Sequence, residues 1–193
     1  MILFFDTETT GFFNDRVPVD HASQPHLVQL AALLCQPDGA EVMSVSLIVN
    51  PSVPIPTQAS NVHGITDAIA AERGVTPDMA VDLFAHLYRL ADTVVAHNIK
   101  FDKGIMEAAI ARRHGKVLRL SKPLFCTMEA ASPIVNLPPT DRMLAAGFDK
   151  PKPPKLEECI RHFFDEALDG AHDALIDVAA CRRVYFHLKT LEN

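Results

Sequence analysis

Four carboxylates and one histidine stand where their side chains could do chemistry. Asp6 and Glu8 lie in the segment F-F-D-T-E-T-T-G near the N-terminus. Asp102 ends the stretch H-N-I-K-F-D, and His172 and Asp177 lie in H-D-A-L-I-D. The acids stand beside apolar residues typical of a core, where unpaired Asp and Glu are rare. If these segments meet, their charges need a cation, and carboxylate oxygens favour Mg²⁺ or a similar hard ion.

The first acids belong to a predicted strand. Ile2 to Thr7 is a short apolar run that predicts a buried central strand. Because strand side chains alternate between faces, Asp6 and Glu8 point the same way and the residue between them points the other way. Asp102 follows the predicted strand Thr93 to Ala96 at the start of a predicted helix. It therefore lies at the carboxyl end of a strand, where open α/β sheets hold their sites.

The C-terminal pair predicts a turn followed by a helix. His172 and Asp177 are five positions apart, which is roughly 140° around a helix of about 3.6 residues per turn. They would not share one helix face, so we expect His172 just before the helix and Asp177 in its second turn. The preceding Asp169-Gly170 pair indicates a mobile turn. A histidine on such a turn could take a proton from water.

The elements that must position these groups follow from periodicity and turn residues. Further strands are predicted at 27–35, 41–50 and 124–127, and further helices at 58–71 (broken by Gly64), from 76, and at 101–113, 156–164 and 173–191. Strands gathered early and then alternating with helices predict an α/β fold with a mixed sheet, the first strand innermost. We expect residues 1–193 to form a single domain.

Composition narrows the class of protein. Lys and Arg number 18 and Asp and Glu number 24, which gives a net charge of −6 and excludes a protein that coats nucleic acid non-specifically. No segment reaches membrane-spanning length, so we expect a cytoplasmic protein without a membrane partner. The cysteines form no C-x-x-C motif, and we expect buried thiols at Cys35, Cys126, Cys159 and Cys181.

Taken together, the motifs resemble the DEDDh family of 3′-5′ exonucleases, whose best-known members are the proofreading epsilon-type subunits of bacterial DNA polymerases. The first family motif matches residues 6–11, the second 97–102, and the third is the pair His172 and Asp177. The family segment V-H-G-I-T stands at 62–66. The resemblance covers essentially the whole chain.

The resemblance implies a ribonuclease H-like fold, with a five-stranded mixed sheet and helices on both faces. It implies that two Mg²⁺ or Mn²⁺ ions are held by Asp6, Glu8, Asp102 and Asp177, and that His172 is the general base. It further implies contacts to the terminal nucleotide from Thr9, Phe12, His63 and Asn98. Phe12 stands where the family often has an aliphatic wedge, and the segment Ser132 to Pro154 is longer than in compact relatives.

The sequence-based function is therefore metal-dependent removal of nucleotides from the 3′ end of single-stranded nucleic acid, with DNA favoured over RNA. The product would be a nucleoside monophosphate, and a DNA polymerase could be a partner in trans. An RNA-trimming or oligoribonucleotide-degrading enzyme of the same fold stays open, as does a catalytically silent nucleic-acid-binding module. Aspartyl-phosphate enzymes are disfavoured because the second acid is Glu8.

The segment Ser132 to Pro154 predicts a long loop. It holds six prolines and little periodicity, and loops of this length are usually functional or mobile. Basic residues outnumber acidic ones in and just after it, with Arg142, Lys150, Lys152 and Lys155 against Asp141 and Asp149. We expect this loop to contact phosphates of the strand upstream of the scissile bond.

Overall fold

The computed structural model describes residues 1–191 and is built around β1 (Ile2–Thr9). This strand pairs antiparallel with β2 (Leu27–Cys35) and parallel with β4 (Thr93–Ala96). β3 (Glu41–Ile48) lies beyond β2, and β5 (Leu124–Cys126) lies beyond β4, giving the order β3-β2-β1-β4-β5. The predicted mixed sheet with its first strand innermost is confirmed.

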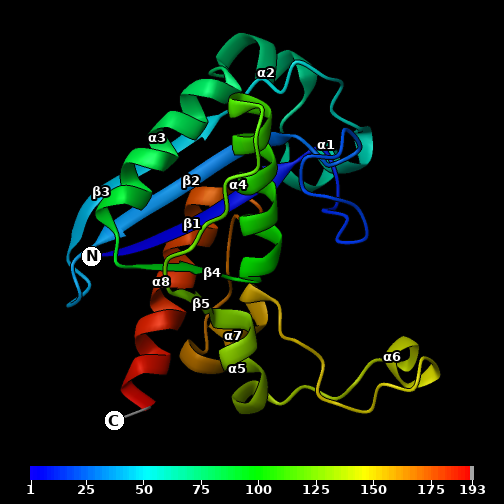
Figure 1. The fold of residues 1–193 in the computed structure, drawn as a ribbon. Coiled ribbons are helices and arrows are strands. Elements are labelled where there is room, and N and C mark those ends of the chain that lie inside the picture. Colours follow the sequence, from blue (N-terminus) through cyan, green and yellow to red (C-terminus); the bar gives the residue numbers. More distant parts are fainter. Residues whose placement is uncertain (192–193) are drawn as a thin grey trace.

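Helices cover both faces of the sheet (Figure 1). α3 (Pro77–Leu90) and α4 (Ile99–His114) pack on the face to which Phe5 points. α8 (Ala174–Leu191) packs on the opposite face, to which Phe4 points. Because successive residues of a strand alternate between faces, the register of β1 decides which later side chains meet which helix.

Shorter helices complete the described chain. They are α1 (Thr57–His63), α2 (Asp67–Arg73), α5 (Thr127–Val135), α6 (Asp141–Ala145) and α7 (Leu156–Phe164). Gly64 ends α1 with φ of 77°, so the predicted break at this glycine is confirmed. α4 begins two residues before the predicted start at Phe101, and β3 ends two residues before the predicted end at Asn50.

The long loop predicted at 132–154 is wrong in part. α5 continues through Pro133 to Val135, and α6 lies in the middle of the segment. Ala131 and Val135 are buried against α7 and α8, so their packing outweighs the helix hydrogen bond that proline cannot donate. The prolines of this segment predicted a loop, although short helices form within it.

The structure bears on two expectations from composition, the burial of the cysteines and the absence of a membrane-spanning segment. Cys35, Cys159 and Cys181 are buried, whereas Cys126 is only half-buried, because the short edge strand β5 leaves it less covered. Within residues 1–191 no helix combines the length and the apolar character that crossing a membrane requires.

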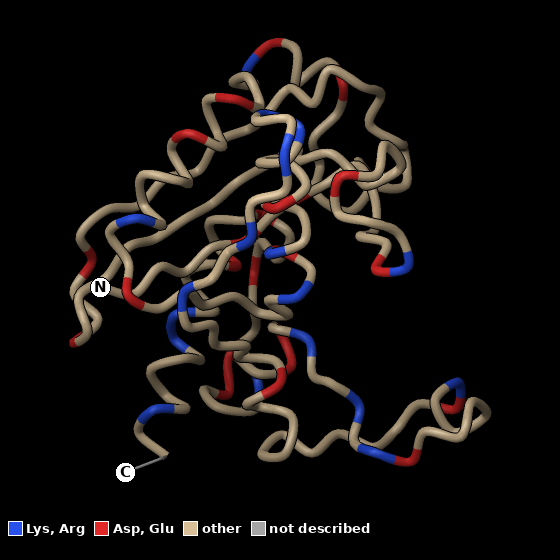
Figure 2. The backbone as a smooth tube through the Cα atoms, viewed as in Figure 1, with Lys and Arg blue, Asp and Glu red and all other residues tan. Residues whose placement is uncertain are grey.

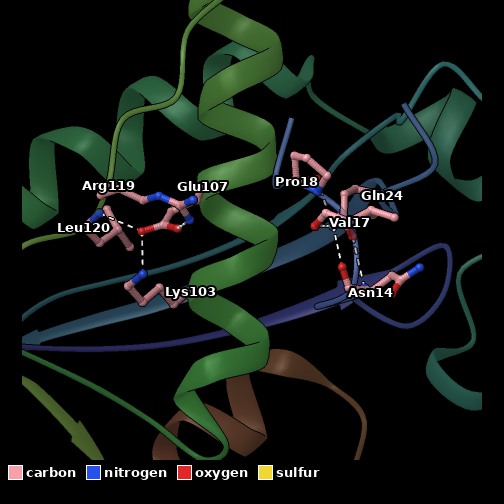
Figure 3. Close-up of polar contacts among 8 residues, drawn as sticks. All are labelled: Asn14, Val17, Pro18, Gln24, Lys103, Glu107, Arg119 and Leu120. Carbon is pink, nitrogen blue, oxygen red and sulfur yellow. Dashed lines mark hydrogen bonds and ion pairs between the residues drawn. The ribbon is translucent and has the colours of Figure 1, made fainter. Parts of the chain in front are cut away.

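Two buried polar side chains brace the elements around the site (Figure 3). Glu107 of α4 is 1% exposed and accepts hydrogen bonds from the Arg119 guanidinium at 2.6 Å and the Leu120 amide at 2.8 Å. Gln24, also 1% exposed, accepts from the Asn14 amide at 3.1 Å and donates to the Asn14 carbonyl at 2.7 Å. The second network holds the loop that follows β1, and this loop carries Phe12.

Candidate active site

Four of the predicted site residues meet at the carboxyl end of β1. Asp6 and Glu8 continue the face of β1 on which α8 packs. One carboxylate oxygen each of Glu8 and Asp177 and one ring nitrogen of His172 all lie within 4.8 Å of one another. Asp6 lines one cavity together with His172 and Asp177. The structure therefore joins the first and the third acidic segments.

Asp102 reaches the same place from the other side of the sheet. β4 pairs with β1 only as far as Phe4, so the edge of β1 beyond this residue is open. There the amide and the hydroxyl of Thr7 both donate to Oδ1 of Asp102, at 3.0 and 2.8 Å. Asp102 is 2% exposed. Thr7, which the sequence reasoning did not assign to the site, positions this acid.

A second acid on α4 shows what is unusual about Asp102. Glu107 is equally buried, but its carboxylate is paired with Lys103 at 2.6 Å and with Arg119 at 2.6 Å. Within residues 1–191 no Lys or Arg pairs with Asp102 or Asp6 in this way. A buried acid that is paired serves the fold, whereas buried acids that face only other acids call for an added cation.

Burial and mutual repulsion raise the pKa of the clustered acids. The pKa of Asp6 rises well above its usual range, first through burial and then through the charges of Asp102 and Asp177. Burial is also the largest cause for Glu8, whose pKa rises to about 8, and for Asp102, whose pKa rises to about 7. The charged forms are thus disfavoured in this structure, and a bound cation would restore them.

His172 and Asp177 are arranged by a tight turn ahead of α8. The amide of His172 donates to Oδ2 of Asp177 at 3.0 Å, and His172 has φ of 71° with an exposed side chain. α8 begins at Ala174, so His172 precedes it as predicted, but Asp177 lies in the first turn rather than the second. The reason is that the helix begins one residue later than the predicted start at Asp173.

The donor set fits a hard divalent cation. Oδ1 of Asp177 is buried and has no hydrogen-bond partner among the described residues, which is costly for a carboxylate oxygen unless an ion occupies its free side. The acids whose charges act on one another here are Asp6, Glu8, Asp102 and Asp177. Oxygen ligands of this kind suit Mg²⁺ or Mn²⁺ better than softer metals.

Two cavities flank the acids. One, of about 470 Å³, is lined by Asp6, His172 and Asp177 on one side and by the segment 153–157 on the other. A smaller cavity of about 280 Å³ lies beside Glu8. The side chain of Phe12 is 93% exposed and lines both. It therefore stands between them.

The predicted substrate-binding residues divide between these cavities. Thr9, Phe12 and His63 line the smaller one, and Asn98 lines the larger one with φ of 67°. The amide of Ile65 donates to Nδ1 of His63 at 3.1 Å, which places the ring proton of neutral His63 on Nε2. This Nε2 is buried and lacks a partner among the described residues. Burial lowers the pKa of His63, and the nearby backbone of Thr9 partly opposes this effect.

The sequence reasoning missed the role of His97. One ring nitrogen, Nδ1, lies 2.9 Å from the hydroxyl of Thr127, and the other, Nε2, lies 3.0 Å from the carbonyl of Pro154. His97 thus ties the end of β4 to α5 and to the wall of the larger cavity. Burial lowers its pKa to about 4. Its place beside Asn98 in the second motif was the only sequence signal, because Thr127 and Pro154 are distant in the chain.

A five-stranded sheet of this order, with acids gathered from β1, α4 and α8, has the ribonuclease H-like architecture. The chain belongs to the exonuclease family, whose RNase T model matches residues 3–185. The resemblance to DEDDh-type 3′-5′ exonucleases and the predicted fold are confirmed at the level of family and architecture.

Curated proteins with sequences similar to this chain include an epsilon-like protein and an exodeoxyribonuclease. The chain is 37% identical over 101 residues to a DNA polymerase III subunit epsilon-like protein of Rhodobacter capsulatus, covering 51% of this chain and 13% of the relative. It is 31% identical over 106 residues to exodeoxyribonuclease 10 of Escherichia coli K12, covering 55% and 40%. The chain therefore spans less than half the length of these curated relatives.

Solved structures of exonuclease I from E. coli share the architecture. The complex with a dT13 oligonucleotide superposes with a TM-score of 0.75 at 18% identity, over 98% of this chain and 41% of that one. A zinc-bound form of its complex with single-stranded DNA gives 0.73 at 17% identity, over 98% and 40%. At these identities the likeness shows the fold.

Proposed function

We propose that the protein is a metal-dependent exonuclease that removes nucleotides from the 3′ end of single-stranded DNA and releases nucleoside monophosphates. The observation that carries this proposal is the convergence of four acids with raised pKa values beside an exposed histidine, at the mouth of a cleft. The names of the relatives, which include an exodeoxyribonuclease and a DNA-bound exonuclease I, support DNA as the substrate.

The metal ligands in this proposal are Asp6, Glu8, Asp102 and Asp177, which would hold two Mg²⁺ or Mn²⁺ ions. Such ions, when bound, lower the pKa of an attacking water and stabilise the charge on a leaving oxygen. Thr7 holds Asp102 in place through its two hydrogen bonds. The His172 amide does the same for Asp177.

His172 is the general base in this proposal. Its ring is exposed beside the acid cluster, on a turn that includes Gly170 and precedes α8. A nitrogen of the ring can accept the proton of the water that attacks the scissile phosphate, and solvent can then take that proton away. The short reach between His172 and Glu8 keeps the base at the site of attack.

Selection of a strand end is assigned to the smaller cavity. Phe12 can separate the last base from the one before it, because its ring is exposed and borders both cavities. The buried Nε2–H of His63 can donate to the sugar or phosphate of the last nucleotide. Thr9 is itself held by the Gly11 carbonyl, to which its hydroxyl donates at 2.5 Å. In this proposal the cavity of about 280 Å³ takes the last nucleotide of the strand.

RNA stays a second candidate substrate, because the acid cluster itself does not read the sugar and contacts to the 2′-hydroxyl would decide the choice. A DNA polymerase as partner in trans is favoured only by the epsilon-like relative. A catalytically silent binding module is disfavoured, because all five residues for the reaction meet in one place.

A time course tests the proposal. Single-stranded DNA and RNA of one sequence, each labelled at the 5′ end, would be incubated with Mg²⁺ or Mn²⁺ and sampled on a sequencing gel. We expect a ladder that shortens one nucleotide at a time on DNA and stops with chelator. Internal fragments without a ladder would contradict an exonuclease, and faster shortening of RNA would reassign the substrate.

A further inference from the structure

Residues 137–152 form an arm that projects from the body of the molecule (Figure 1). The arm begins and ends at a bridge between Leu137 and Lys152, where the Lys152 amide donates to the Leu137 carbonyl at 3.0 Å. α6 lies at its outer end and contains no buried residue. Apart from Leu137 at its base, which packs against the cluster of α5, α7 and α8, the arm therefore adds little to the core and needs another explanation.

Local hydrogen bonds, not packing, shape the outer end of the arm. The hydroxyl of Thr140 accepts from the Met143 amide at 3.3 Å and caps the start of α6. After the helix Gly147 has φ of 79°, and the Phe148 amide donates to the Met143 carbonyl at 2.8 Å. This is a helix end of the Schellman type. Prolines at 138, 139 and 151 stiffen both sides of the arm.

The exposed groups of the arm include an aromatic ring and two cations, Arg142 and Lys150, each of which follows an exposed acid, Asp141 or Asp149. Phe148 is 63% exposed, a large fraction for an aromatic ring on an ordered segment. Arg142 and Lys150 are exposed and form no ion pair within residues 1–191. Figure 2 shows basic positions along the segment that returns from α6 to the body of the molecule. This segment leads directly to Pro153 and Pro154, which line the same cavity as Asp6.

We propose that the arm binds the single strand that extends from the cleft, with Phe148 stacking on a base and with Lys150 and Arg142 contacting phosphates. Exposed aromatic rings flanked by cations are the usual chemistry of single-strand binding. A stiff arm loses little freedom when it binds. This inference rests on the proposed function, since it places the 3′ end of the same strand at the acid cluster.

The test separates binding of a long strand from cleavage of a short one. Affinity would be measured by fluorescence anisotropy with an oligonucleotide of about 16 nucleotides, the upper site size of single-strand-binding domains, in an Asp6→Asn background so that the strand survives. Cleavage of a dinucleotide, too short to reach the arm, would be measured without that change. Phe148→Ala should weaken binding about fivefold to a hundredfold, the range for loss of one stacked base.

Variants at the same position identify the chemistry. Phe148→Trp should bind at least as well as the unchanged protein, whereas Phe148→Leu, which stays apolar, should bind as weakly as Phe148→Ala. Lys150→Gln should reduce the slope of log affinity against log salt by about 0.7, the value for one phosphate contact on a single strand. Met79→Ala on α3, where the side chain is 58% exposed, is the control and should change nothing.

The outcomes distinguish this inference from the proposed function. If the Phe148 variants cleave the dinucleotide at the unchanged rate but bind the long strand more weakly, the proposed role of the arm is supported. Equal loss on both substrates, loss on neither, or normal binding by Phe148→Leu would overturn it. So would a dimer in sedimentation that Phe148→Ala dissociates without changing DNA affinity, because the arm would then bind a second copy. If long single-stranded DNA gives no ladder but the arm variants still weaken its binding, the proposed function fails while the arm remains a single-strand contact.

Discussion

At the scale of single residues, the partner of a buried acid decides its role. Glu107 and Asp102 lie on the same helix and are both almost fully buried. Glu107 is matched by Lys103 and Arg119, whereas Asp102 accepts hydrogen bonds from Thr7 and pairs with no Lys or Arg among residues 1–191. The cost of burying a charge is similar in both cases, so Asp102 is neutralised either by a proton, since its pKa is raised to about 7, or by a cation from solution.

The raised pKa values predict how metal-free stability depends on pH. In the folded state the pKa of Glu8 is about 8 and that of Asp102 about 7, while in the unfolded chain both acids have their ordinary values near 4. Between about pH 4 and 8 the folded state therefore binds more protons, and stability in chelator should fall as pH rises.

Asp6→Asn should relieve this loss. At pH 8 in chelator we expect the variant to melt at least about 3 °C higher than the unchanged protein, or about 1 kcal/mol for a chain of this length. Thermal unfolding followed by circular dichroism measures it. Asp141→Asn on the exposed α6 is the matched control and should leave the melting temperature where it was. A lower melting temperature for Asp6→Asn would show that the acids do not repel one another.

Loss of the base should slow catalysis without weakening binding. His172→Asn removes the ring yet tolerates the φ of 71° at this position, which alanine tolerates less well. We expect kcat to fall by about 10²- to 10⁴-fold, the usual scale for a general base, with KM little changed. Steady-state kinetics on a short oligonucleotide would show it. His86→Asn on α3 should behave as the unchanged protein, and a loss below tenfold would assign the proton to another group.

At the scale of elements, the lengths of neighbouring strands create the site. β1 extends past the end of β4, so Thr7 is left without a strand partner on that edge and can hold Asp102 instead. The alternation of β1 places Asp6 and Glu8 on the side of α8, which delivers Asp177. His97, directly after β4, joins α5 and the segment before α7 to the same end of the sheet.

His97 should make stability sensitive to acid. Burial lowers its pKa to about 4, compared with about 6.5 in the unfolded chain. The unfolded state therefore binds more protons between these values, so the contribution of neutral His97 is complete above about pH 6.5 and is lost as pH falls toward 4.

A glutamine at this position isolates the effect. Because His97→Gln cannot take up a proton, the melting temperature of the unchanged protein relative to the variant should drop by more than about 3 °C between pH 7 and 4.5. The acid cluster makes both proteins more stable as pH falls, and this shared effect cancels when their melting temperatures are compared at each pH. A constant difference across this range would mean that His97 is not a buried neutral group.

At the scale of the whole molecule, the acid cluster links stability to metal. A ligand that binds only the folded state stabilises it by about 2.7 kcal/mol at a concentration of 100 Kd. For this length we expect Mn²⁺ or Mg²⁺ to raise the melting temperature by about 5–10 °C and chelator to reverse the change. In Asp6→Asn the rise should be less than a third of this. An equal rise in the variant would place the stabilising ion elsewhere on this acidic protein.

Much of the architecture could be predicted from the sequence because its causes are local. The apolar run of β1, the proline after Thr76 at the start of α3 and the glycine that ends α1 each act on their own neighbours in the chain. The two-residue spacing of Asp6 and Glu8 decides their shared face whatever the rest of the chain does. The motifs therefore predicted the acid cluster before any contact was known.

Only the tertiary structure decided which groups complete the site. The hydrogen bonds of Thr7 to Asp102 depend on where β4 ends, and the pairing of Glu107 with Arg119 depends on the path of the chain after α4. The helix through Pro133 forms because α7 and α8 cover it. The physical reason is common to all three: packing between segments distant in the chain determines burial and partners, and a local pattern carries no information about a distant neighbour.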